Sequence, residues 1–134
     1  MILHQNGLFT LDYTPATDIL FVKWPNSQFV VLGEIRQTFQ ILVENIRNYD
    51  IKYLLIDAQH TSLEVDAQEY KATLLQFAQD LHTTRLRKMA RLMSGDEIRE
   101  RHLQELLEQQ LLLSFEVQNF EDRTTALAWL TSMN

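Results

Sequence analysis

The amino-acid sequence predicts an α/β fold, a single domain over residues 1–134, with the element order β-β-α-β-α-β-α-β-α. Apolar residues switch several times between a period of two and a helical period along the chain. With 134 residues and 46% hydrophobic content, the chain has enough material for one core. Strands alternating with helices favour parallel pairing. We therefore expect a mostly parallel five-stranded sheet, with the first strand antiparallel at an edge.

The first two strands form a predicted hairpin. Apolar and polar residues alternate from Leu8 to Tyr13, which is the pattern of a half-buried strand. Pro15 and Asp18 lie in a stretch typical of turns, and Ile19 to Trp24 reads as the returning strand. The short connection implies that the two strands are antiparallel.

A helix and a central strand follow. Apolar residues recur at helical spacing from about Val31 to Asn48. The apolar run Tyr53–Ile56 then ends at Asp57, and such a run is typical of a parallel strand that is covered on both faces. A second helix is expected from Asp66 to Leu81.

The second half of the chain repeats this alternation. Residues Lys88 to Met93 read as the fourth strand, and Ser94 with Glu97 forms a capping box that would start a third helix. Residues Phe115 to Phe120 read as the fifth strand, and Asp122 would cap a last helix.

Composition argues against several kinds of chemistry. The chain has no cysteine, which removes disulfides and thiolate metal ligands, and its four histidines lack metal-binding spacing. The three glycines are too far apart for a phosphate-binding loop. The sequence therefore predicts no enzyme, no metal and no cofactor.

Charge and hydropathy suggest a cytoplasmic protein. A formal net charge of −6 disfavours nucleic acid as a partner. No signal peptide is evident, and no apolar stretch approaches the roughly 18 residues that span a membrane. One basic cluster stands out, and we expect it to be a solvated turn and strand start: Arg85, Arg87, Lys88 and Arg91.

Three stretches resemble the STAS domain family, especially its small stand-alone bacterial members. They are the hairpin Leu11–Trp24, the strand Tyr53–Asp57 and the C-terminal segment Phe115–Leu130. The resemblance implies a non-enzymatic domain that binds a protein or a small ligand, in some members under control of phosphorylation. In this chain Ala58 stands where the family's acceptor serine would align, so a phosphorylation switch is not expected, although Asp57 matches the family's strand-end aspartate.

Ligands of parallel α/β sheets gather at the carboxyl ends of the strands. This rule selects a set of candidate ligand- or partner-binding residues: Trp24, Asp57, His60, Thr61, Ser62 and Ser94. Each also has a structural explanation: packing for Trp24, strand-end hydrogen bonds for Asp57, helix capping for Ser94 and solvation for the others.

Arg91 is the hardest residue to place. It falls inside the fourth strand and should share a face with Met89. A charged side chain there needs solvent or a partner. The sequence therefore leaves open an exposed face near the sheet edge or an interface with a second subunit, which would make the protein a homodimer.

Three functional hypotheses follow. The leading one is a cytosolic binding or regulatory module that recognises a partner protein. The second is a binder or sensor of a small apolar, lipid-like ligand between helices and sheet, flanked by Phe21, Trp24 and Tyr53. The third is an enzyme of unrecognised class that uses Asp57 with His60.

Overall fold

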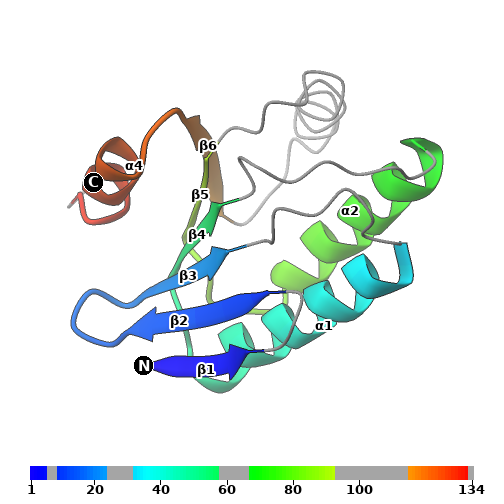
Figure 1. The fold of residues 1–134 in the computed structure, drawn as a ribbon, viewed down its shortest axis with the longest axis horizontal. Coiled ribbons are helices and arrows are strands. Elements are labelled where there is room, and N and C mark those ends of the chain that lie inside the picture. The colour runs from blue at the N-terminus through cyan, green and yellow to red at the C-terminus, as the bar shows by residue number, and fades with distance from the viewer. Residues whose placement is uncertain (6–8, 24–31, 58–66, 93–114, 133–134) are drawn as a thin grey trace.

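The computed structural model describes residues 1–5, 9–23, 32–57, 67–92 and 115–132 (Figure 1). In these residues it has six strands and three helices. In chain order they are β1 (Ile2–Gln5), β2 (Thr10–Thr14), β3 (Ile19–Lys23), α1 (Leu32–Asn48), β4 (Tyr53–Asp57), α2 (Ala67–Leu81), β5 (Lys88–Leu92), β6 (Glu116–Phe120) and α4 (Arg123–Leu130). The helix predicted to start at Ser94 lies outside the described residues.

The strands form one sheet in the order of the sequence, β1-β2-β3-β4-β5-β6. The pairs from β1 to β3 are antiparallel, and those from β3 to β6 are parallel. The predicted α/β class and the mostly parallel sheet are therefore confirmed.

The prediction of five strands, with the first at an edge, was wrong. The predicted first strand is β2, which lies one place in from the edge, because β1 pairs outside it. The sequence pattern did not predict β1 because this strand has only four residues. Its two apolar residues precede its two polar ones, so the alternation typical of a strand is absent.

The main core lies between the sheet and the two long helices α1 and α2. The predicted alternation in β2 is confirmed, because Leu11 and Tyr13 are buried in this core. On α1 the apolar residues at helical spacing from Ile35 onward are buried: Ile35, Phe39, Leu42, Val43 and Ile46.

The smaller helix α4 packs on the opposite face of the sheet, over β4, β5 and β6 (Figure 1). α4 also reaches β3, since Arg123 lies over the Phe21 ring and Ile19 belongs to the core under α4, whereas no described helix packs over β1 or β2 on this face. The difference has a physical cause: a parallel sheet is apolar on both faces, whereas antiparallel strands can expose a polar face. Thr10, Asp12 and Thr14 of β2 accordingly alternate with its buried residues.

A buried lysine holds the C-terminal end of α4. The side chain of Lys88 is only 6% exposed. Its ammonium donates to the Trp129 carbonyl at 3.0 Å and to the Ser132 hydroxyl at 2.8 Å, and it lies 5.1 Å from the centre of the Trp129 ring. A cation at the carbonyl end of a helix is favoured by the helix dipole.

The expectation that the basic cluster is solvated was therefore wrong for two of its four members. Arg85 and Arg87 are exposed, but Lys88 and Arg91 are buried. The sequence pattern missed this because a long basic side chain can be buried when hydrogen-bond acceptors meet its charged end.

Arg91 finds a partner inside the chain. Its guanidinium donates to the side-chain oxygen of Asn119 at 3.0 Å, from the residue that faces it on β6. With 8% exposure Arg91 does not lie on an open face, so that alternative is excluded. Its role in a subunit interface stays a prediction.

A polar cluster ties the β2–β3 turn to the start of β4. The Tyr13 hydroxyl donates to one oxygen of Asp18 at 2.7 Å, and the Lys52 ammonium binds the other at 3.0 Å. Asp18 has a φ of 58°, a left-handed conformation that aspartate tolerates better than most residues. This hydrogen bond, then burial, and then the charge of Asp18 raise the pKa of Tyr13 to about 12.

The raised pKa predicts a stability difference at alkaline pH. Because the pKa of Tyr13 is higher in the folded than in the unfolded protein, the protonated hydroxyl stabilises the folded state. This contribution is complete below the unfolded pKa of 10.0 and is lost as pH rises through about 12. Replacing Tyr13 with Phe should cost about 1.5 kcal/mol at neutral pH, through the lost bond to a charged acceptor. Urea unfolding should show that the difference in free energy of unfolding between wild type and Tyr13→Phe decreases as pH rises from 10.0 to about 12.

Tyr49 provides the control, because its side chain is half exposed. Tyr49→Phe should leave the free energy of unfolding nearly unchanged. A gap for Tyr13→Phe that stays constant from pH 10 to pH 12 would contradict the account.

The prediction that Asp122 caps the last helix is confirmed. Its carboxylate accepts from the Thr125 backbone N–H at 2.7 Å and from the Thr125 hydroxyl at 3.0 Å. These bonds, the backbone one first, lower the pKa of Asp122.

A lowered pKa stabilises the folded state above the unfolded value, and the contribution is lost as pH falls through the folded value. Asp122→Ala should therefore lower the midpoint of thermal unfolding at neutral pH. The difference in midpoint between wild type and the variant should become smaller in acid. Asp122→Asn should lower it less, since asparagine also caps helices. Thermal melts followed by circular dichroism test this, and an equal gap at every pH would count against the cap.

Candidate functional site

The carboxyl ends of the parallel strands form a rim. Lys23, Asp57, Leu92 and Phe120 end β3, β4, β5 and β6, and they lie side by side in register. α4 begins just beyond Phe120, so strand ends and a helix N-terminus meet there. This is the edge at which ligands of such sheets gather.

Of the predicted ligand- or partner-binding residues, the structure describes only Asp57, which lies on the rim and is half-buried. The others lie outside the described residues: Trp24, His60, Thr61, Ser62 and Ser94. Asp57 follows Tyr53 and Leu55 in the strand alternation, and both of these pack in the core under α4. Its carboxylate therefore belongs to the α4 face, as does the neighbouring Lys23.

A groove of about 450 Å³ lies on the same face, between β2–β3 and α4. Its floor is apolar, made by Ile19, Phe21 and Leu55. Hydroxyl groups and charges surround this floor. The remaining lining residues are Asp12, Thr14, Thr17, Arg123, Thr124, Leu127, Ala128 and Thr131. The groove exists because α4 covers β4 to β6 and stops short of β2.

An arginine and an aromatic ring join the groove to the rim. The guanidinium carbon of Arg123 lies 4.3 Å from the centre of the Phe21 ring. A cation in the first turn of a helix is disfavoured by the helix dipole, and the ring offsets this cost. A contact between a cation and a ring uses no N–H hydrogen bond, so the N–H groups of Arg123 can donate to a bound carboxylate. Phe21 also precedes Lys23 by one strand repeat, so the Lys23 side chain lies on the same face of the sheet as the ring.

Threonine hydroxyls, one aspartate, one arginine and apolar side chains line this groove. Its side chains include neither histidine nor cysteine, the commonest proton acceptor and the strongest nucleophile of enzymes. No group of three metal-ligating side chains gathers in the described part of the chain. The same residues contain no helix of the length and hydropathy needed to cross a bilayer.

Further depressions lie elsewhere among the described residues. One of about 600 Å³ lies near the amino ends of the parallel strands and is lined in part by Tyr53 and Lys88. The ammonium of Lys88 is already bound by α4, so its role there is structural. Phe21 and Tyr53, which the apolar-ligand hypothesis placed around one pocket, line two different depressions.

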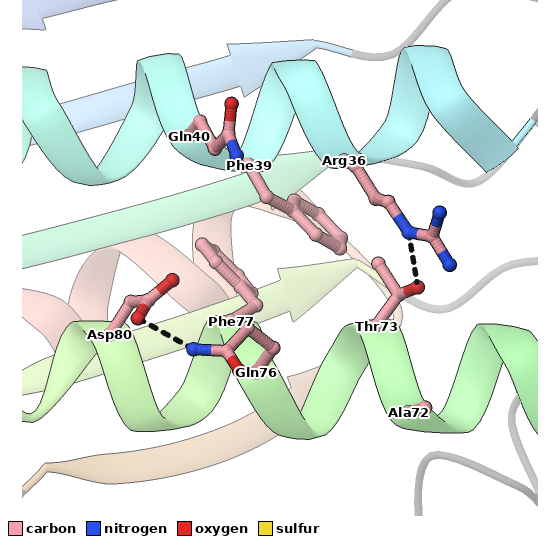
Figure 2. Close-up of a pocket in the computed structure, with 8 residues that line it drawn as sticks. All are labelled: Arg36, Phe39, Gln40, Ala72, Thr73, Gln76, Phe77 and Asp80. Atoms are coloured by element: carbon pink, nitrogen blue, oxygen red, sulfur yellow. Dashed lines mark hydrogen bonds between the residues drawn. The ribbon is translucent and has the colours of Figure 1, made fainter.

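The third depression is a groove of about 250 Å³ between α1 and α2 (Figure 2). Phe39 and Phe77 form its floor, with stacked rings whose centres are 4.1 Å apart. Arg36 lies at one end and Asp80 at the other.

Sequence reasoning did not select Arg123. The signal was available, because a cation in the first turn of a helix is unusual and calls for a compensating contact. What the sequence does not show is that α4 would start beside β3, since these two elements are far apart along the chain.

Comparisons with known proteins agree with the fold. A family model described as SpoIIAA-like matches residues 30–131. A solved structure of an uncharacterised protein of the DUF3478 family with a SpoIIAA-like fold, from Shewanella loihica PV-4, superposes with a TM-score of 0.60 at 17% identity. That match covers 95% of this chain and 98% of the other, and at this identity it speaks for the fold alone. No curated protein matches.

The match to the family model extends from just before α1 to the end of α4. It therefore includes the carboxyl ends of β4, β5 and β6, but not that of β3. It confirms the resemblance to STAS domains that the sequence suggested. This chain belongs to the SpoIIAA-like family.

Proposed function

We propose that this protein is a cytoplasmic, non-enzymatic regulatory module that binds a partner protein through the rim and the adjoining groove beside α4. One observation carries the proposal: the Phe21–Arg123 pair lies where the groove meets the rim. SpoIIAA-like domains are typically regulatory binding modules, which supports the class of function but names no partner.

The groove has the composition of a protein-binding surface. Aromatic and arginine side chains dominate the binding energy of protein interfaces, because they bury a large area and still offer polar contacts. Here the apolar floor can receive an apolar side chain of the partner. Arg123 can receive a carboxylate, and the threonine hydroxyls can bond to the partner's backbone.

The predicted rim residues belong to the same proposal. Asp57 lies beside Lys23 in register, so the rim offers one acceptor and one cation next to the groove. Trp24 follows β3, Ser94 follows β5, and His60, Thr61 and Ser62 follow β4 in the sequence. We propose these five as further contacts from the connections that leave the rim.

Substitutions in the groove test the proposal. Phe21→Ala and Arg123→Gln should each weaken binding of the partner about tenfold or more, which is the usual cost of removing an interface hot spot. Arg85→Gln is the matched control, because Arg85 is exposed and lies outside the groove. The proteins captured by immobilised wild type are identified first, and their affinities for each variant are then measured by calorimetry.

Circular dichroism must show that each variant is folded. Arg123→Gln is the decisive variant, because its side chain is exposed and the core under α4 stays intact. Equal affinity of wild type and Arg123→Gln for every captured protein would contradict the proposal. Native mass spectrometry of the freshly isolated protein would instead favour the apolar-ligand hypothesis if it showed a bound small molecule and no protein partner.

A further inference from the structure

The groove between α1 and α2 carries opposite charges at its two ends. The Arg36 guanidinium donates to the Thr73 hydroxyl at 3.4 Å across one end. Asp80 lies about two helical turns further along α2 than Thr73, which is roughly 10 Å. The stacked rings of Phe39 and Phe77 lie between these ends (Figure 2).

Neither charge is neutralised within the described part of the chain. Arg36 bonds to a neutral hydroxyl, and Asp80 accepts from the Gln76 side chain at 2.9 Å. None of the ion pairs among the described residues includes either of them. Arg36 is exposed and Asp80 is half-buried, so both can meet a charged partner from outside.

The arrangement of Arg36 and Asp80 in one copy of the chain is complementary to the same arrangement in a second copy. A twofold axis that passes through the Phe39–Phe77 stack, at right angles to the line from Arg36 to Asp80, exchanges the two ends. Each arginine then faces the aspartate of the other copy, as an isologous interface requires. We propose that a second copy of this chain docks on the α1–α2 groove through two reciprocal Arg36–Asp80 ion pairs.

The groups near the middle of the groove fit the same occupant. Gln40 of α1 and Gln76 of α2 line it. A primary amide carries both donors and acceptors, so it can pair with another amide after a twofold rotation. The acidic chain, with a net charge of −6, repels another copy in general, and this groove brings one positive and one negative group to the contact.

The size of the face sets the expected strength. α1 has 17 residues and α2 has 15, so each helix is roughly 25 Å long, and two adjacent helices are roughly 20 Å wide. A face of this size is at the small end of specific interfaces, which implies a weak, concentration-dependent dimer. Ion pairs at such a surface contribute modestly, so their main effect is on orientation and partner choice.

Charge exchange gives a sharp test in sedimentation-velocity experiments over a wide range of concentration. Wild type should form a dimer at high concentration. Arg36→Glu and Asp80→Lys should each weaken dimerisation about tenfold, because each turns two attractive contacts into two repulsive ones. An equimolar mixture of these two variants should recover a dimer, since the introduced glutamate of one chain then meets the introduced lysine of the other. A single chain that carries both changes should also dimerise.

The variants are expected to fold. Arg36→Glu places a negative charge near the start of α1, and Asp80→Lys places a positive charge near the end of α2, and the helix dipole favours both. Arg85→Glu is the control, since it makes the same change of charge at an exposed site outside this groove.

Three results would overturn the proposal: a wild type that is monomeric at every concentration, a dimer that Arg36→Glu weakens no more than Arg85→Glu does, or a mixture of the two charge variants that stays monomeric.

Discussion

The buried ammonium of Lys88 fixes where α4 lies, and the rim and the groove depend on that position. Lys88 starts β5, one strand in from the β6 edge of the sheet, and binds the carbonyl of Trp129 and the hydroxyl of Ser132. A buried cation must be met by acceptors, since leaving it unpaired would cost several kcal/mol. This requirement holds the C-terminal end of α4 over the parallel strands. At the other end the Asp122 cap starts the helix beside Phe21, where Arg123 stacks.

The sheet explains why a groove remains there. The central parallel strands β4 and β5 are buried on both faces and need a cover on each, whereas the antiparallel strand β2 packs on one face and exposes polar residues on the other. α4 covers β4 to β6 and reaches only as far as β3. The boundary between covered and uncovered strands therefore runs along β3, and it leaves Ile19 and Phe21 as an apolar floor beside polar β2. The same boundary reaches the rim at Lys23 and Asp57.

Much of this fold could be predicted from local patterns. α1, β4 and the Asp122 cap each carry a strong signal within a few residues, and the structure has all three. β1 could not be predicted, because four residues that pair at an edge leave no periodicity. The burial of Lys88 could not be predicted either, since its acceptors lie on α4, far along the chain. For the site, the rim and Asp57 follow from topology, whereas Arg123 depends on contacts between distant elements.

Hydrogen exchange of the backbone amides in Lys88→Met, compared with wild type, tests the role of Lys88 most directly. Methionine keeps an unbranched apolar side chain of four atoms, like the stem of lysine, and removes the charged donor. If the ammonium holds α4, amides of residues 123–130 should exchange faster in the variant, while those of α1 and β2 should keep their wild-type rates. Unchanged protection of α4 in a folded Lys88→Met variant would show that apolar packing alone positions the helix, and it would contradict the account.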